Sequence, residues 1–554
     1  MESSAQNLSP SFVPKGGGET TLHPFDQKIV SLTQAEHIEL KQQINYWKSQ
    51  YELLKKKNQT LKQDLDLANA KIKDLNQRLY GKKSEKGVTK PDKNPNQCLP
   101  SRKPRGQQKG SQGHGRTPRP DLPIVEELRD VAPEDKACGV CGKTYHPLSK
   151  TEDSKITEVH VKAHVRLIKR KMYAKACECD GVPGIITATL APRLIPKGSI
   201  GVSVWTEILL SKFLFSRATG NLCRDYDDRG LPISTGTITD GLKRIAPLFE
   251  PIIELFITKQ LTEDLFHNDE TDWKVFEAIE GKVGYRWYLW VIQSRSVVYY
   301  IAAPTRSGDI PIDYFSGLDK TLEQVIVVCD RSRTSCASLH KTIHGQNRYS
   351  AYKRLSRENA IIILAFCWAH VRRDFLDAAK SWPELEAWMF AWVDRIAELY
   401  THNKQRLAHW DETRDVADQS PAFQASHQTL EQAIEQMKAR CESDLEKETL
   451  HTAQRKVLES LKNHWLGLIV FVESPQVPMD NNTAEQRMRN PAMGRKNYYG
   501  SGRQWSAALA AMMFSVFQTL LLWRLNPHHW LHCYLTACAE NGGRPPDDMS
   551  AFIP

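Results

Sequence analysis

The sequence predicts a multidomain α+β protein, with an N-terminal coiled coil, a zinc ribbon, a helical region and an α/β core in that order. Three observations carry this prediction. A heptad pattern runs from Leu40 to Leu79, two pairs of closely spaced cysteines follow, and strand-like segments alternate with helical ones after residue 260. The chain has 554 residues, which is enough for several such domains.

Composition narrows the class of protein. The net charge of +10 and the pI of about 8.9 favour anionic partners. Twelve cysteines are too few for a disulfide scaffold of this length. Residues 1–30 are expected to form a disordered tail, and the N-terminus lacks the basic-then-apolar order of a signal peptide. We therefore expect a cytoplasmic protein.

One apolar segment, residues 504–523, has the length of a membrane span. Polar residues interrupt it at Ser506, Ser515, Gln518 and Thr519. The segment is therefore interpreted as a buried core helix, and no membrane partner is expected.

Residues 31–82 predict a coiled coil, because apolar residues recur at alternating steps of four and three. One seam position holds Ile44, Tyr51, Asn58, Leu65, Ile72 and Leu79, and the other holds Leu40, Trp47, Leu54, Leu61, Ala68 and Leu75. A polar Asn58 at the seam favours two strands, so a homodimer or higher oligomer is expected. The alternative is a long amphipathic helix that packs on its own chain.

Residues 83–122 predict a flexible linker rich in Lys, Arg, Gly, Pro and Gln. Such a segment can neutralise phosphates without reading base sequence, and the alternative is a solvated linker without a partner.

Residues 123–182 predict a zinc ribbon. Cys138 and Cys141 have the two-residue gap of a zinc-binding turn, and strand-like residues separate them from Cys177 and Cys179. Four thiolates would hold one structural Zn²⁺. Because the second pair is tightly spaced, three histidines are possible substitute ligands, namely His146, His160 and His164.

Residues 183–260 are expected to be helical, with Ser234 or Thr235 as a helix cap. A helix-turn-helix element and a plain helical hairpin both fit this region.

Three carboxylates then suggest a metal site. Asp269 lies within a predicted strand and Asp330 ends another, at the kind of sheet edge where α/β proteins place chemistry. Glu485 lies on a predicted helix that Asn481 or Asn482 would cap. Carboxylates suit Mg²⁺, and two ions could act on a phosphodiester. The alternative is a surface salt-bridge network, because a basic run follows Glu485.

Longer motifs make this assignment specific. Three stretches resemble the IS66 family of bacterial insertion-sequence transposases, namely "HNDETDWKV", "LAFCWAHVRRDFLDAA" and "MDNNTAEQRMRNPAMGRKNYYGSG". So do "RLYGKKSEK", the cysteine pairs and the terminal "LNPHHWLHCYLTACAENGGRPPDD". The resemblance covers almost the whole chain beyond the N-terminal tail.

The resemblance implies a DDE-type transposase with an RNase H-like catalytic core. That core would comprise residues 261–379 and 471–524, with a helical insertion at 380–470 and a C-terminal segment at 525–554. Asp269, Asp330 and Glu485 match the family's acidic triad, which would bind two Mg²⁺ or Mn²⁺ ions. Asp480 is an alternative ligand, but its place before the helix favours a role in starting it.

The resemblance also implies binding to double-stranded DNA at the element ends and at the target, in the bacterial cytoplasm and nucleoid. Small accessory proteins of the same element are implied partners. The residues expected to contact DNA phosphates are Arg372, Arg373, Arg487, Arg489, Arg495 and Lys496.

The chain departs from the family pattern in one place. The family word "DRYSAYKRL" is interrupted after Arg331 and resumes at Tyr349, so residues 332–348 look like an insertion. An inactive DNA-binding derivative is therefore one alternative function. A metal-dependent nuclease without strand transfer is another, and a strand-transfer assay separates it from a transposase. In "CWAH", Cys367 and His370 could bind a metal, but a buried strand precedes them and favours packed core positions for both.

Overall fold

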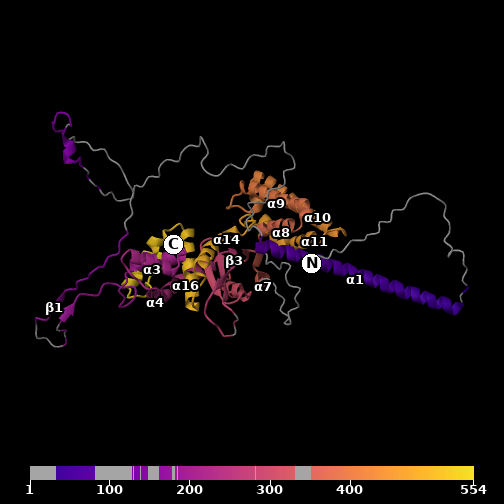
Figure 1. Ribbon diagram of the computed structural model, residues 1–554, viewed down its shortest axis with the longest axis horizontal. Coiled ribbons are helices and arrows are strands. Elements are labelled where there is room, and N and C mark those ends of the chain that lie inside the picture. The colour runs from indigo at the N-terminus through magenta and orange to yellow at the C-terminus, as the bar shows by residue number, and fades with distance from the viewer. Residues whose placement is uncertain are drawn as a thin grey trace, which may run out of the picture.

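The computed structural model describes residues 31, 33–80, 126, 128, 130–137, 139–146, 161–176, 181, 183, 185–280, 282, 284–330 and 351–553. Figure 1 shows a sheet between two groups of helices, with a long N-terminal helix that extends away from them. The predicted α+β class is confirmed. The predicted tail (1–30), basic linker (83–122) and insertion (332–348) lie outside the described residues.

The central sheet is mixed, with five strands in the order β5-β4-β3-β6-β7. Their bounds are β3 Leu265–Lys274, β4 Arg286–Gln293, β5 Val298–Ala303, β6 Val325–Cys329 and β7 Ile362–Phe366. β4 is antiparallel to both β3 and β5, whereas β6 is parallel to both β3 and β7. Asp269 therefore lies within β3, and Asp330 directly follows β6.

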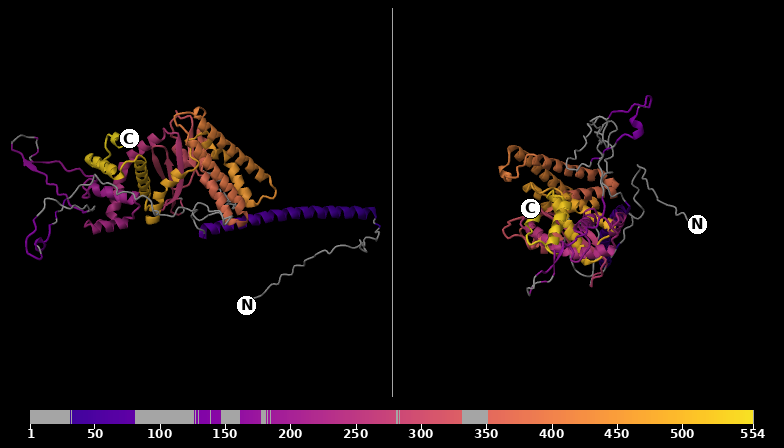
Figure 2. Two further views of the ribbon diagram at one scale, coloured as in Figure 1. Left: turned by 90° about the horizontal axis from the view of Figure 1, so that it is seen from above. Right: turned by 90° about the vertical axis from the view of Figure 1, so that its left-hand side faces the viewer.

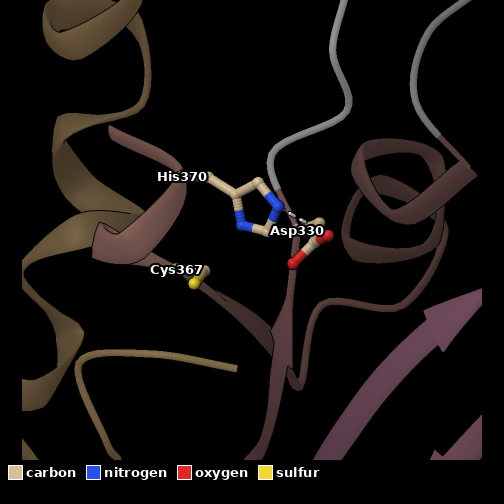
Figure 3. A group of neighbouring side chains, drawn as sticks. All are labelled: Asp330, Cys367 and His370. Atoms are coloured by element: carbon tan, nitrogen blue, oxygen red, sulfur yellow. Dashed lines mark ion pairs between the residues drawn. The ribbon is translucent and has the colours of Figure 1, made fainter. Parts of the chain in front are cut away.

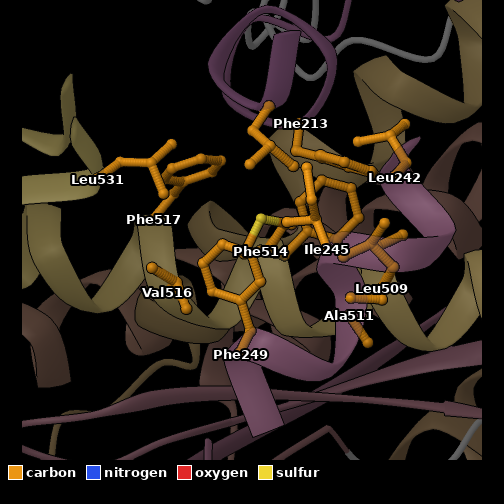
Figure 4. Close-up of a cluster of buried hydrophobic side chains, with 14 of the residues drawn as sticks. Phe213, Leu242, Ile245, Phe249, Leu509, Ala511, Phe514, Val516, Phe517 and Leu531 are labelled. Atoms are coloured by element: carbon orange, nitrogen blue, oxygen red, sulfur yellow. The ribbon is translucent and has the colours of Figure 1, made fainter. Parts of the chain in front are cut away.

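Side chains of the sheet alternate between two apolar cores. Leu289 and Val291 of β4 belong to one core, whereas Trp290 and Ile292 belong to the other, as the two-residue period of a strand requires. Figure 4 shows part of the first core, in which Phe514 packs among side chains of the helices that directly precede the sheet, such as Phe213 and Ile245. Helices thus cover both faces of the sheet.

The first core includes the helices that precede the sheet and those that end the chain. The former are α2 Val202–Leu209, the π-helical turn η4 Leu210–Leu214, α3 Thr219–Asp228, α4 Thr235–Ile245, η5 Ala246–Phe249 and α5 Glu250–Gln260. The latter are α14 Asn482–Arg487, α15 Arg489–Tyr498, α16 Gln504–Leu522, α17 Pro527–Glu540 and η8 Ser550–Phe552. Ser234 caps α4 by accepting a bond from the Thr237 amide at 3.1 Å, so one of the two predicted caps is confirmed.

The second core lies under the remaining helices, which include a stack of α8, α9 and α10. These elements are α6 Asp309–Phe315, α7 Ala351–Glu358, α8 Trp368–Ser381, η6 Pro383–Leu385, α9 Glu386–Leu407, η7 Val416–Asp418, α10 Pro421–Glu446, α11 Thr452–Asn463, α12 Trp465–Leu468 and α13 Val470–Glu473.

The N-terminal helix α1, Gln34–Tyr80, is continuous and contacts α8 and α11, while most of its length extends from the body (Figures 1 and 2). The large apolar seam side chains between Leu40 and Ile72 are 46–67% exposed. A coiled coil therefore stays a prediction, and it now has an exposed stripe that a second helix could cover.

The cysteine-bearing region is described only in part. A two-stranded antiparallel sheet joins β1 Met172–Ala174 to β2 Ile185–Thr187, and η3 spans Pro133–Lys136. Cys141 is exposed, whereas Cys138, Cys177 and Cys179 lie outside the described residues. The zinc ribbon remains a prediction.

Helix α16 is long and apolar enough to cross a membrane, and no other described helix is, but two thirds of its most apolar window (67%) is buried in the fold. Its polar residues have specific partners. Ser515 accepts a bond from the Tyr300 amide at 2.9 Å, and Thr519 both accepts from the Val298 amide at 3.0 Å and donates to the Val298 carbonyl at 3.1 Å. Two helix hydroxyls thus satisfy the backbone of the edge strand β5.

We expect Thr519→Val to destabilise the protein by roughly 1–3 kcal/mol, because it leaves a buried amide and a buried carbonyl of β5 without partners. Thr401→Val is the matched control, since the Thr401 hydroxyl is exposed and bonds only the Ala397 carbonyl of its own helix. Chemical denaturation of both variants measures the difference. Equal stabilities would contradict the proposed role of α16 as the cover of the β5 edge.

Candidate active site

The strand register sets three chemically active side chains in a row. Asn268, Cys329 and Phe366 are partners across β3, β6 and β7. The residues that follow these three in the chain are Asp269, Asp330 and Cys367, respectively. Because these strands are parallel and lie about 4.8 Å apart, all three residues reach the same edge of the sheet.

Asn481 brings the helix α14 to this row. Its backbone amide donates to Cys367 Sγ at 3.3 Å, and its side-chain amide donates to the Asn268 carbonyl at 2.8 Å. Its own carbonyl accepts a bond from the Glu485 amide at 3.1 Å. Asn481 is fully buried, so Glu485 is held one helical turn away from the row.

His370 connects two of the carboxylates. The helix α8 begins directly after β7, and its first turn places the His370 imidazole against the end of β6 (Figure 3). The Nε2 atom lies 3.1 Å from Asp330 Oδ2 and 3.9 Å from Glu485 Oε1. Cys367 and His370 are both buried, as predicted. The interpretation of His370 as a packing residue was incomplete, however, because its ring contacts the candidate site.

The carboxylates repel one another. Burial, followed by the charges of Asp330 and Glu270, raises the pKa of Asp269 well above its usual range. Burial and the charges of Glu485 and Glu270 raise the pKa of Asp330 to about 7, against the opposing effects of a bond from Asn481 and the charge of Arg373. This pattern is expected where several acids share a poorly hydrated site.

Glu270 is a fourth acid that sequence reasoning missed. It follows Asp269 on β3, and it is held by Tyr352, whose hydroxyl donates to Oε2 at 3.0 Å, and by Arg306, whose Nε donates to Oε1 at 2.9 Å. These bonds fix Glu270 as a charge behind the row. Its neighbour Asp269 accepts only the Glu270 amide, at 2.8 Å, among the bonds found in the described part of the chain.

The donor set suits a hard divalent cation. Oδ1 of Asp330 is buried and has no hydrogen-bond partner among the residues that the structure describes. Carboxylate oxygens are the ligands that Mg²⁺ and Mn²⁺ prefer, and a cation would relieve the repulsion among them. Asp330, Cys367 and His370 also have ligand atoms within 4.8 Å of one another, but burial raises the pKa of the Cys367 thiol to about 11 and disfavours the thiolate.

Asp480 lies beside the site without joining the row. Its Oδ1 accepts a bond from the Asn482 amide at 3.1 Å at the start of α14. Asn481 occupies the N-cap position, but its side chain makes no capping bond there. The Asp480 side chain therefore stabilises the start of the helix, as the sequence led us to expect. The expectation that the Asn481 side chain would cap the helix was wrong.

The six basic residues expected to contact DNA are not equivalent. Arg372 and Arg373 are half-buried on α8, each with an interaction inside the protein. Arg487 points inward, where its guanidinium donates to Gln293 Oε1 at 2.9 Å and to Gln518 Oε1 at 3.1 Å. These bonds give Arg487 a structural role, and its contact with DNA stays a prediction.

The other three predicted DNA contacts lie on α15. Arg489 and Lys496 are exposed. Arg495 is half-buried, and its Nη1 donates to Thr271 Oγ1 at 3.1 Å and to the Asp272 carbonyl. Arg495 thus reaches β3 two residues beyond Asp269, which places a cation close to the row of acids.

Comparisons with known proteins identify a family and several relatives. A family model described as "Transposase IS66 family" matches residues 197–509, which include all three carboxylates. Two uncharacterized proteins of Sinorhizobium fredii are similar over most of their length. The protein y4jD is 24% identical over 77% of this chain and 79% of its own, and y4hP is 24% identical over 77% of this chain and 74% of its own.

The raised pKa of Asp330 predicts a pH-dependent stability. The folded protein binds this proton up to about pH 7, whereas the unfolded chain releases it near the ordinary value of 3.8, so stability falls as pH rises through that interval. We expect Asp330→Asn, without divalent cations, to melt several degrees above the parent protein at pH 8 and much closer to it at pH 4.

Melting scans across this pH range, with and without Mn²⁺, measure the effect. Mn²⁺ should raise the melting temperature of the parent protein more than that of Asp330→Asn, because the variant lacks a ligand. A difference between the two proteins that does not change with pH would contradict the assignment.

Proposed function

Because this chain belongs to the IS66 family of transposases, we propose that it cuts DNA at the ends of an insertion sequence and joins them to a target. The meeting of Asp269, Asp330 and Glu485 from two strands and a distant helix carries this proposal. The sheet order, with an antiparallel β3-β4-β5 set continued by parallel β6 and β7, supports an RNase H-like core. The helices between Glu386 and Asn463 would be its insertion.

In this proposal the three carboxylates hold two Mg²⁺ or Mn²⁺ ions. The bound ions would supply neutralising charge and an activated water for attack on a phosphodiester. His370 would keep the Asp330 carboxylate oriented, and Glu270 would add negative charge behind it. Hydrolysis frees a 3′-hydroxyl at the element end, and that hydroxyl attacks target DNA by transesterification without a covalent protein intermediate.

The remaining regions would bind and pair the DNA ends. Arg489, Arg495 and Lys496 are suited to contact phosphates beside the acids, and the basic linker would add affinity without sequence preference. A zinc ribbon formed by Cys138, Cys141, Cys177 and Cys179, together with the α3–α4 helical pair, would contact the terminal repeats. Two copies joined through α1 would hold two ends at once.

The triad is tested by single substitutions. We expect Asp269→Ala, Asp330→Ala and Glu485→Ala each to abolish cleavage and strand transfer on the element's own ends, because each removes a metal ligand. DNA binding should survive, since the basic surfaces supply most of the affinity. Gel assays of cleavage and joining, with a separate binding assay, distinguish these effects.

Asp480→Ala is the matched control, because Asp480 is an adjacent carboxylate that only starts α14. It should cost ~1 kcal/mol of stability and leave the reaction intact. Normal cleavage by the three Ala variants would sink the triad assignment. A parent protein that is inactive but gains activity when residues 332–348 are deleted would instead identify a silenced copy that only binds DNA.

Self-association is tested on the seam of α1. Leu54 and Leu61 are 59% and 55% exposed on the predicted seam. We expect the double substitution Leu54→Glu, Leu61→Glu to convert a dimer into a monomer in sedimentation experiments, because two charges would be buried at the interface. Leu53→Glu is the control, since Leu53 is equally exposed but lies off the seam. A parent protein that is monomeric at high micromolar concentration would contradict the coiled coil.

A further inference from the structure

A pocket lies farther along β3 than the row of acids. It has a volume of about 560 Å³, within the range of ~300–1,000 Å³ that is usual for ligand sites. Residues from the end of β3, the start of β4 and the end of α15 line it. The four cations among them are Lys274, Arg286, Arg495 and Lys496, and the only carboxylate is that of Asp272.

Two of these cations repel each other across the sheet. Lys274 and Arg286 are direct partners across the antiparallel β3–β4 pair, where like charges destabilise a sheet. Both side chains are exposed, and neither forms an ion pair with any residue that the structure describes. An anionic ligand would relieve this repulsion.

Three exposed aromatic rings line the same pocket, beside the buried Trp273. Phe276, Tyr285 and Tyr499 are 47%, 52% and 67% exposed. The rings of Phe276 and Tyr285 have centroids 5.8 Å apart at an angle of 49°. Exposed rings interleaved with cations are the pattern by which proteins bind unpaired nucleic acid, with bases stacked on the rings and phosphates on the cations.

The backbone holds Tyr499 at the rim in a disfavoured conformation. Its φ of 66° is left-handed, which is unusual for a bulky residue. The next residue, Gly500, has a φ of 141°, and a Cβ there would lie 2.2 Å from the Lys274 carbonyl. That carbonyl accepts the Ser501 amide at 2.8 Å, so the segment is bonded to the end of β3. The left-handed Tyr499 is the C-cap that ends α15, and its amide donates to the Arg495 carbonyl at 2.9 Å. The cap therefore fixes where the mostly exposed Tyr499 ring lies at the rim of the pocket.

We propose that this pocket binds one unpaired nucleotide of the DNA strand, with its base against Tyr285 and Tyr499 and its phosphate between Lys274, Arg286 and Lys496. The proposal rests on the function proposed above and adds a subsite to it. Asp272 lies three residues beyond Asp269, which is about 10 Å along the strand. Stacked nucleotides are spaced by about 3.4 Å, so the bound nucleotide would lie some three positions from the scissile phosphate.

The test uses the full-length protein with no added Mg²⁺ or Mn²⁺, which prevents cleavage, and without a chelator, which keeps the proposed structural Zn²⁺ in place. Fluorescence anisotropy measures binding of a labelled single-stranded oligonucleotide and of the blunt duplex of the same sequence. We expect Tyr285→Ala and Tyr499→Asn to weaken single-strand binding roughly fivefold to a hundredfold, as loss of one stacking partner implies, and to leave duplex binding unchanged. Arg286→Gln should reduce the slope of log affinity against log salt concentration by about 0.7.

Tyr285→Phe and Tyr499→Phe are the matched controls, because they keep the rings and should keep the affinity. Tyr499→Asn should melt no lower than the parent protein, since asparagine tolerates the left-handed conformation, so lost binding cannot be ascribed to unfolding. Unchanged single-strand binding in the two ring-deletion variants, or an equal loss for duplex and single strand, would overturn the proposal. The expected pattern in a protein that fails to cleave would support the pocket while refuting the transposase reaction.

Discussion

The candidate site depends on the buried bonds of Asn481. This one side chain and its backbone join the middle of β3, the first residue after β7 and the first turn of α14. Both bonded N–H groups of Asn481 are buried, and moving the segment would leave them without these partners, so the contacts favour a single position for the segment. Glu485 lies more than 150 residues from Asp330 in the sequence, and the bonds of Asn481 help to hold it at the same edge of the sheet.

The protein can fold in spite of the repulsion among these acids, because contacts elsewhere in the sheet stabilise the fold. Two apolar cores clamp the sheet from both faces, and Ser515 and Thr519 of α16 satisfy its β5 edge. Within that frame the site can keep carboxylates that repel one another, and the bond from Asn481 and the charge of Arg373 offset the repulsion only in part. Stability given up at one edge of a sheet is a common feature of sites built for a charged ligand.

Periodicity and chain order were sufficient to predict much of the fold. The strand around Asp269, the strand before Asp330, the helix cap at Ser234 and the buried helix at 504–522 all follow from local patterns. The contacts of the site were harder to predict, because they depend on strand register and on segments far apart in sequence. "CWAH" was correctly expected to be buried, but only the immediate start of α8 after β7 turns His370 toward Asp330. Likewise, a basic run cannot reveal that two glutamines face Arg487 inside the protein.

The segment from Asn481 to Ser501 links the acids to the pocket that Tyr499 borders. It starts at the bonds of Asn481, continues through α14 and α15, and ends where Ser501 bonds the Lys274 carbonyl. Between these two attachments, β3 extends past the end of β6, and Arg495 bonds its Asp272 carbonyl. Both ends of the segment are therefore tied to one rigid strand, so the distance between the acids and the aromatic rim is set by the rise of β3. A DNA strand bound along β3 would therefore meet the acids and the aromatic rim at a fixed separation, because neither attachment can move without breaking bonds to the sheet.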